Sequence, residues 1–184
     1  MEDFVLYNPV KLHFGKGVAQ KTGKFARQFG AKALLVYGNG SVMNNGAWQD
    51  VVSSLTDAGV EIVAFGGIRP NPVMEDVDRA ALIGRNEKVD MVVAVGGGSV
   101  IDSAKMMAIA IPSGHDVWDF ITGQSKPRAA LPLLAVLTLA ATGTEMNHYA
   151  VIQNNHTKQK VGYGHPSMYP RHSFLDPGYT LSVS

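Results

Sequence analysis

The sequence predicts an α/β fold in which helices cover both faces of a parallel sheet. Short runs of continuous apolar residues, typical of strands that are buried on both faces, alternate with segments in which apolar residues recur at helical spacing. Each parallel connection has to cross the sheet from end to end, so this alternation favours a parallel sheet. Glycine-rich clusters follow two of the apolar runs directly.

The first half of the chain contains two predicted helices and two predicted strands. A helix is expected over residues 18–29, where the side chains of one face recur at steps of four, three and four before Gly30. The run ALLVY then predicts a buried strand over residues 33–37. A second amphipathic helix is expected over residues 48–55, and the β-branched run that follows it predicts a strand over residues 60–65.

The second half continues the same alternation. Prolines and glycines predict a loop over residues 66–72, and helical spacing predicts a helix over residues 73–85. The run MVVAV predicts another buried strand over residues 91–95, and the glycine cluster after it leads into a helix that ends near Pro112. The next strand is expected over residues 133–137. We therefore expect four strands that alternate with helices.

The two ends of the chain are less regular. Residues 4–14 are expected to form an edge strand that is able to pair with a second copy of the chain. From about Gln153 onward polarity rises and helical periodicity is lost. That segment is interpreted as irregular, as a hairpin, or as docked on something outside this chain.

The composition excludes several kinds of partner and setting. Sixteen Lys and Arg residues against fifteen Asp and Glu give a net charge of +1, too balanced for the basic face that nucleic acid requires. The longest apolar run, residues 129–141, is interrupted by Pro132 and is shorter than the ~20 residues that span a membrane, so no membrane is expected. With no cysteine and no signal pattern at the N-terminus, a cytoplasmic protein with one domain over residues 1–184 is expected.

The sequence Val95–Asp102 (VGGGSVID) is the first candidate site. In an open α/β sheet, ligands bind beyond the carboxyl ends of the strands. Glycines there let a diphosphate approach the backbone, and the free N–H groups of the following helix point at it. The alternative is a plain helix cap, because Ser99 and Asp102 have the spacing of a capping box. A cap needs at most one glycine, so three glycines favour a Rossmann-like dinucleotide-binding domain, although the literal G-x-G-x-x-G pattern is not met.

The sequence Gly38–Ser41 (GNGS) is the second cluster, and it can also be interpreted as a simple turn. A site that prefers NAD commonly carries a carboxylate near such a strand end, which holds the ribose 2′-hydroxyl and repels a 2′-phosphate. Asn39 and Ser41 are neutral. The cluster therefore favours NADP(H) over NAD(H).

Five segments together resemble the iron-containing (group III) alcohol dehydrogenase family, and in particular its NADP(H)-dependent aldehyde reductases and butanol dehydrogenases. They are FGKG at 14–17, GGIRPNP at 66–72, VGGGSVID at 95–102, LT with ATGTE at 137–145 and LDPGYT at 175–180. The resemblance covers the whole chain but only the N-terminal, nucleotide-binding half of the family's architecture. It implies metal-dependent interconversion of an alcohol and an aldehyde or ketone, and, because similar proteins are dimers, a homodimer.

The resemblance also implies roles for individual residues. Gly97, Gly98 and Ser99 resemble the diphosphate contacts, and Asp102 resembles a carboxylate near the nicotinamide. Gly38, Asn39, Gly40 and Ser41 match the loop around the adenine ribose. The positions that line the cofactor cleft in similar proteins are Asn71, Thr138, Thr142, Asn147, Lys160 and Tyr179. As alternatives, Lys160 is a solvated lysine, and Thr142 or Thr144 a turn or helix cap.

No metal site is expected in this chain. In the family, one Asp and three His hold the metal, Fe²⁺ or Zn²⁺, in a helical second domain beyond the LDPxYT segment, and the sequence ends at Ser184. The spacings of His148, His156, His165 and His172 give no helical pair, so solvated or locally bonded histidines are expected. We therefore expect a fragment or natural truncation that binds NADP(H) weakly and alone reduces nothing.

Two other interpretations stay open on the sequence. One is a non-catalytic nucleotide-binding module from a truncated gene. The other is an enzyme like the glycerol dehydrogenases or dehydroquinate synthases, which share a related glycine-rich turn, although the GGIxPNP and LDPxYT segments favour the alcohol dehydrogenases.

Overall fold

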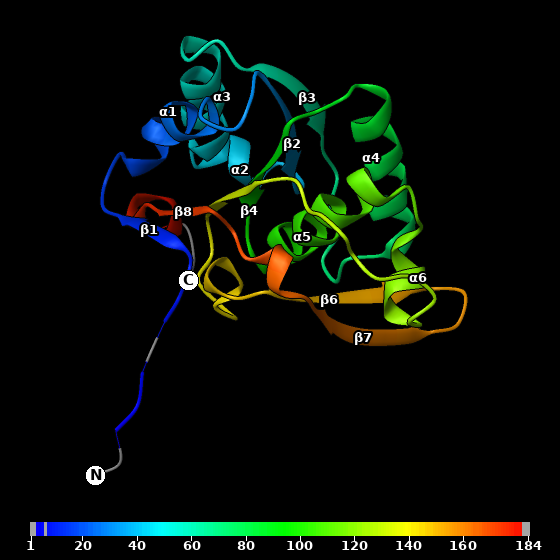
Figure 1. Cartoon of the computed structure of the whole chain (residues 1–184). Coiled ribbons are helices and arrows are strands. Elements are labelled where there is room, and N and C mark those ends of the chain that lie inside the picture. Colours follow the sequence, from blue (N-terminus) through cyan, green and yellow to red (C-terminus); the bar gives the residue numbers. More distant parts are fainter. Residues whose placement is uncertain (1–2, 6, 182–184) are drawn as a thin grey trace.

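The computed structural model describes residues 3–5 and 7–181, and its main feature is a six-stranded parallel sheet (Figure 1). The strands are, in spatial order, β1 (Lys11–Phe14), β8 (His172–Leu175), β5 (Leu133–Leu137), β4 (Met91–Gly96), β2 (Lys32–Tyr37) and β3 (Glu61–Phe65). The four predicted strands are β2, β3, β4 and β5, and the parallel α/β fold is confirmed.

Helices cover both faces of the sheet (Figure 1). On one face lie η1 (Val18–Lys21), α1 (Thr22–Ala26), α2 (Ser41–Asn44) and α3 (Ala47–Asp57); on the other lie α4 (Met74–Asn86), α5 (Gly98–Ser113) and α6 (Val117–Ile121). Successive residues of the central strands point into different cores: Val92 and Ala94 pack toward α4 and α5, while Val93 and Val95 pack toward α3. This two-sided burial explains why the central strands show no alternation in the sequence.

The first helix is shorter than the predicted 18–29. Its first turn is the 3₁₀ helix η1, and α1 ends at Ala26. The N–H groups of Gln28 and Phe29 donate to the carbonyls three residues earlier, which tightens the last turn. Helical spacing continues through Phe29, but the backbone has already left the α-helix. The one-turn helix α2 was not predicted.

The C-terminal segment contains a hairpin, one of the three interpretations of that region. Strands β6 (Tyr149–Asn154) and β7 (Gln159–Gly164) pair antiparallel in a separate two-stranded sheet. The segment after them, with the short 3₁₀ helix η3 (Pro166–Met168), leads into β8, which lies in the main sheet between β1 and β5. The prediction of four strands was therefore wrong, and no partner outside the chain is needed to dock β8.

The N-terminal strand is also shorter than predicted. Only residues 11–14 form a strand, and they pair in parallel with β8 of the same chain. The described residues before them extend away from the body of the molecule, and Phe4, Val5 and Tyr7 are at least 81% exposed (Figure 1). Position 6 of the predicted segment lies outside the described residues. Pairing with a second copy stays a prediction. Within residues 3–5 and 7–181, no helix has the length and apolarity that crossing a bilayer requires.

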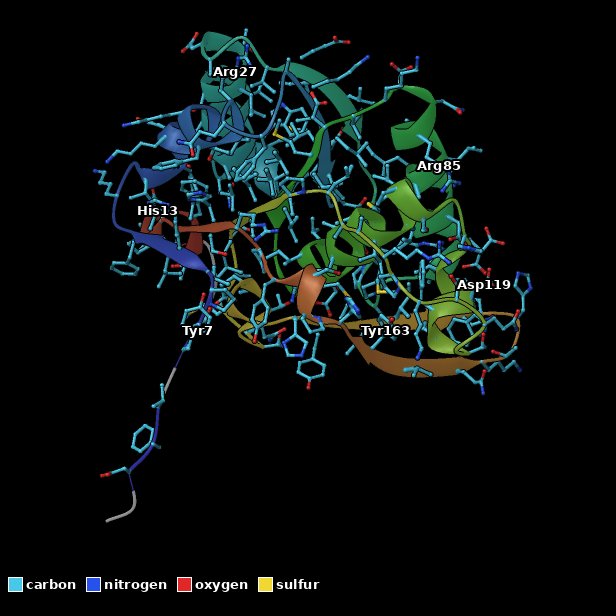
Figure 2. The ribbon with its side chains drawn as sticks, viewed as in Figure 1. Tyr7, His13, Arg27, Arg85, Asp119 and Tyr163 are labelled. Carbon is cyan, nitrogen blue, oxygen red and sulfur yellow. The ribbon has the colours of Figure 1, made fainter. Side chains whose placement is uncertain are left out.

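Two histidines stack across the β1–β8 pair. His13 Nε2 and His172 Nδ1 are 2.9 Å apart, and the rings of Phe25 and Phe174 pack against both histidines (Figure 2 labels His13 on β1). His172 is only 2% exposed. Burial, together with the smaller effects of the neighbouring His13 and Lys11, lowers the pKa of His172 to about 4. The pair is therefore a neutral, part-buried contact that joins the edge strand to the sheet.

The free energy of unfolding is expected to fall as the pH drops from about 6.5 toward 4. The unfolded chain takes up a proton on His172 near pH 6.5, whereas the folded chain takes it up only near pH 4, so lowering the pH through this window favours unfolding. The loss is at most about 3 kcal/mol. Urea unfolding at several pH values measures it. His172→Phe should remove most of this slope, and the exposed His156→Asn should keep it; an unchanged slope in His172→Phe contradicts the assignment.

Candidate functional site

The two glycine-rich loops follow two neighbouring interior strands of the sheet. Strands β2 and β4 pair directly, with Tyr37 opposite Val95. From β2 the chain crosses outward to β3 and then returns to β4 on the other side. This is the topological switch point of the sheet, the place where open α/β sheets in general have a crevice that binds a ligand.

The three glycines at the end of β4 differ in whether the packing of the protein leaves room for a Cβ atom. A Cβ added at Gly96 would lie 2.6 Å from Val100 Cγ2, so the packing of the chain requires glycine there. A Cβ at Gly97 would lie 3.4 Å from Leu139 Cβ, and one at Gly98 would lie 3.5 Å from Thr142 Oγ1, which are ordinary contacts. Neither Gly97 nor Gly98 has a positive φ. Their own surroundings do not require glycine, and close approach of a ligand stays the predicted reason for these two glycines.

The start of α5 also presents free backbone donors. Gly97 is the N-cap residue and no side chain caps the helix. The N–H groups of Val100 and Ile101 donate to Gly97 O at 3.1 and 3.2 Å, while those of Gly98 and Ser99 have no acceptor among the described residues. Two uncapped N–H groups at the positive end of a helix dipole suit an anion such as a diphosphate.

The capping-box interpretation of Ser99 and Asp102 is wrong. Ser99 Oγ accepts a hydrogen bond from Asn71 N–H at 3.3 Å, across the loop after β3. Asp102 Oδ1 accepts from the Thr144 hydroxyl at 2.5 Å, and Asp102 Oδ2 accepts from Val151 N–H at 2.9 Å. Both side chains therefore bind other segments instead of capping their own helix.

Three of the predicted cofactor residues meet at one place. Lys160 Nζ, on β7, donates to Asn71 Oδ1 at 2.7 Å, and Asn71 N–H donates to Ser99 Oγ. Asn71 adopts a left-handed backbone with φ of 59°, which Asn tolerates better than most residues. These contacts hold the hairpin and the loop after β3 against the start of α5. Lys160 is exposed and also bonded to Asn71, so its role in the cofactor cleft stays a prediction.

A pocket of about 190 Å³ lies beside α5. Three of the predicted residues line it, Asp102, Thr142 and Asn147. The rest of the lining is Thr144, Tyr149, Ala150 and Val151. Thr142 also contacts the space in front of Gly98, so the pocket adjoins the bare glycine turn. Thr138 comes directly after β5 and donates its N–H to Gly96 O at 3.1 Å, which places it at the same turn.

The loop after β2 forms a short turn that leads into α2. Ser41 N–H donates to Asn39 O at 2.6 Å, and Gly40 is the N-cap residue of α2. A Cβ at Gly40 would meet nothing within 4 Å, and Asn39, Gly40 and Ser41 are exposed. The loop, with Gly38 at its base, stands open to solvent next to the crevice.

Tyr179 lies farther from this group, in η4 (Pro177–Thr180). It is 5% exposed, and its hydroxyl donates to Asp50 Oδ2 of α3 at 2.6 Å. Burial, reinforced by Asp50, raises the pKa of this phenol. The hydroxyl is engaged in joining η4 to α3, and the predicted role of Tyr179 in the cofactor cleft stays a prediction.

The sequence interpretation assigned no role to Lys105, which is a buried charge. Lys105 lies in the middle of α5 and is 0% exposed. Its ammonium is surrounded by hydrogen-bond acceptors of the segment that lines the pocket. The signal was present, because Lys105 lies at a helical step from Ile101 and Ala108 on a face that is otherwise apolar. A lysine at such a position has to be paired inside the protein.

The histidines do not gather into a metal site. His165 bonds to Ser167, His156 lies 3.3 Å from Glu75, and His148 packs against Tyr149 and Tyr169. In the part of the chain that the structure describes, no three His, Asp or Glu side chains come together as metal ligands.

Comparisons with known proteins agree with the geometry of the sheet and loops. A sequence model described as iron-containing alcohol dehydrogenase matches residues 9–177. The probable NADH-dependent butanol dehydrogenase 1 of Bacillus subtilis strain 168 is 41% identical over 183 residues, which cover 100% of this chain and 47% of that protein. The NADPH-dependent aldehyde reductase YqhD of Escherichia coli K12 is 37% identical over 187 residues, covering 100% of this chain and 47% of that protein.

A solved structure is similar throughout the chain. The NADH-dependent butanol dehydrogenase A of Thermotoga maritima superimposes with a TM-score of 0.95 and 43% sequence identity over 100% of this chain and 46% of that one. The chain thus spans about half the length of the relatives it matches.

Proposed function

The chain belongs to the iron-containing alcohol dehydrogenase family, and from that premise we propose that it binds a nicotinamide dinucleotide for the interconversion of an alcohol and an aldehyde or ketone. The observation that carries the proposal is the start of α5, where Gly97 and Gly98 lack side chains that their surroundings would accommodate. The free N–H groups of Gly98 and Ser99 support the same assignment, since they suit a diphosphate.

The roles of the residues follow from their positions. Gly97, Gly98 and Ser99 would bind the diphosphate, and the loop at 38–41 would lie at the adenine ribose. Asn71 and Lys160, bonded to each other, would form a wall of the crevice. The bound dinucleotide supplies or accepts the hydride, while the protein orients it. The described residues do not supply a metal site, so we derive no metal-dependent step and expect Fe²⁺ or Zn²⁺ only in the full-length enzyme.

Titration of the chain with NADPH and with NADH, followed by cofactor fluorescence, tests the proposal. We expect saturable binding with no turnover of an aldehyde, because the described residues would hold the dinucleotide but offer no metal site that would stabilise an alkoxide. Absence of binding of both cofactors would overturn the proposed function.

Within this proposal NADPH is preferred to NADH. Asn39 and Ser41 are exposed and neutral, so neither repels a 2′-phosphate. The names of the relatives divide between NADH and NADPH, which makes the ratio of the two affinities the decisive measurement. Tighter binding of NADH would overturn the preference while leaving the dinucleotide site in place.

We also propose that the chain forms a homodimer through its N-terminal segment. Strand β1 is an edge strand of the sheet, and the residues before it expose Phe4, Val5 and Tyr7. Light scattering is expected to give twice the monomer mass, and removal of residues 1–10 should give the monomer mass. A monomer mass for the 184-residue chain would contradict the proposal. The cytoplasmic setting and the absence of nucleic acid as a partner remain predictions.

A further inference from the structure

We propose that Lys105 is a positioning residue for the cofactor site, whose ammonium fixes the segment 142–151 beside the bare glycines at the start of α5. The inference rests on the proposed dinucleotide function and adds to it a residue outside the glycine clusters. Lys105 touches neither the crevice nor the pocket surface, so it acts through the groups that it binds.

All three N–H donors of the Lys105 ammonium form hydrogen bonds with one segment of the chain. Lys105 Nζ donates to Thr144 Oγ1 at 2.7 Å, to Asn147 Oδ1 at 2.9 Å and to Tyr149 O at 2.7 Å. An ammonium has three N–H donors, and these three acceptors occupy all of them. All three acceptors lie within six successive residues, from η2 (Thr144–Met146) to the start of β6, so one charge determines the path of that segment.

The same segment forms the wall that a cofactor at Gly98 would face. Thr142 Oγ1 and Thr144 Cγ2 are the atoms nearest to the space in front of Gly98. Thr142, Thr144, Asn147 and Tyr149 line the adjoining pocket. A displacement of this segment would therefore change the crevice at the predicted diphosphate and nicotinamide positions.

The hydrogen bonds continue from Lys105 to Asp102. Thr144 Oγ1 accepts from the ammonium and donates to Asp102 Oδ1, while Asp102 Oδ2 accepts from Val151 N–H. Asp102 is thereby held to both ends of the segment, one helical turn before Lys105. Without the ammonium, Thr144 would keep its bond to Asp102 but lose the contact that places its backbone.

The charges around the ammonium explain why it stays buried. The titratable groups that face it are Asp102 on its own helix, Glu145 in η2 and His148 before β6. Glu145 is 8% exposed, and its Oε2 atom has no hydrogen-bond partner among the described residues, so the lysine supplies the compensating charge. Because its three donors are saturated and it is inaccessible, the amine is not available to add to an aldehyde. These features indicate positioning and exclude a nucleophile.

The test uses Lys105→Met and the matched pair Thr144→Val and Thr144→Ser, with NADPH affinity measured by fluorescence. Lys105→Met and Thr144→Val are expected to weaken the binding of NADPH by about tenfold or more, because each breaks a charge-assisted bond that holds the segment 142–151 in place. Thr144→Ser keeps the hydroxyl and should restore affinity to within about twofold. The double variant Lys105→Met/Thr144→Val should lose less affinity than the two single losses combined, because both single variants break the Lys105–Thr144 bond.

Arg85→Met is the control for loss of a cationic side chain that bonds to α5. Arg85 Nη1 donates to Ala110 O near the C-terminal end of α5, away from the site, and Figure 2 shows Arg85 on α4. This variant is expected to change stability without changing NADPH affinity. A similar loss of affinity in Arg85→Met would assign the effect to helix stability and overturn the inference.

A pH profile separates positioning from a structural role. Burial lowers the pKa of Lys105 to about 8, so above that pH the ammonium loses a proton, a donor and its charge. Wild-type affinity for NADPH should therefore fall as the pH rises through about 8, and Lys105→Met should show a flat profile over the same range. Equal profiles would overturn the inference.

The remaining outcomes are also decisive. If Lys105→Met does not fold, as judged by circular dichroism, the NADPH affinities of Thr144→Val and Thr144→Ser test the inference instead. Equal affinities of these two variants would overturn it. If the wild type binds NADPH and both Lys105→Met and Thr144→Val bind it equally well, the positioning role is wrong and the proposed function stands. If the wild type binds neither NADPH nor NADH, the proposed function fails, and the inference fails with it.

Discussion

Replacing Gly98 with valine is expected to weaken NADPH binding by about 100-fold or more while the fold stays intact. The nearest atom to a Cβ at this position is Thr142 Oγ1 at 3.5 Å, so the protein accommodates the start of a side chain. The same side chain would occupy the space in front of the free N–H groups of Gly98 and Ser99. Loss of two hydrogen bonds to a charged phosphate costs about 3–6 kcal/mol, which is consistent with that fold-change.

The control for this variant is Gly96→Ala, in the same cluster. A Cβ at Gly96 would lie 2.6 Å from Val100 Cγ2, and Val100 is a β-branched side chain at the start of α5 with little freedom to move. Gly96→Ala is therefore expected to lose about 1–3 kcal/mol of stability. Thermal unfolding and fluorescence titration of both variants separate the two effects. Full NADPH affinity in a folded Gly98→Val would place the diphosphate elsewhere.

The contrast between Gly96 and Gly98 marks a limit of sequence interpretation. Three successive glycines predict close approach of a ligand, but one of the three is required by the packing of Val100. The spacing of Ser99 and Asp102 suggested a helix cap, whereas their side chains bind Asn71 on one side and Thr144 and Val151 on the other. Such contacts join residues 28 to 49 positions apart, and no local pattern contains them.

The central strands were predictable because burial on both faces leaves a continuous apolar run. Strands β4 and β5 are buried along their whole length, and their boundaries lie within one residue of those predicted. Strand β8 was not predictable in this way. It has only four residues, and His172 and Ser173 in it are polar; they are buried because His172 bonds His13 and Ser173 bonds Glu145 O. A buried polar pair becomes recognisable only when both partners are placed.

Lys105 shows the same limit for the site. The glycine loops were found because the absence of side chains is visible in the sequence, whereas the role of Lys105 depends on acceptors 39 to 44 residues away. Its position on an apolar helical face signalled a buried charge. The identity of its acceptors required the path of the chain from η2 into β6.

Replacing Gly23 with alanine is expected to cause the largest loss of stability among single-methyl additions in this chain. Gly23 lies in α1 where it contacts α3, and a Cβ there would lie 1.8 Å from Ser54 O and 2.5 Å from Ser54 C. These are backbone atoms within α3, so no side-chain rotation can relieve the overlap. The two helices would have to separate, which would also break the bond from Gly23 N–H to Ser54 Oγ at 2.9 Å.

We expect Gly23→Ala to lower the free energy of unfolding by about 3 kcal/mol or more, the upper end for overpacking, and Tm by roughly 6–12 °C. Gly162→Ala is the matched control, because a Cβ at Gly162 in β7 meets nothing within 4 Å and its backbone needs no positive φ. Thermal unfolding followed by circular dichroism compares the two. Since α1 and α3 lie on the face opposite α5, folded Gly23→Ala should still bind NADPH at low temperature. A Tm equal to that of the wild type would mean that α1 does not pack on α3 through Gly23.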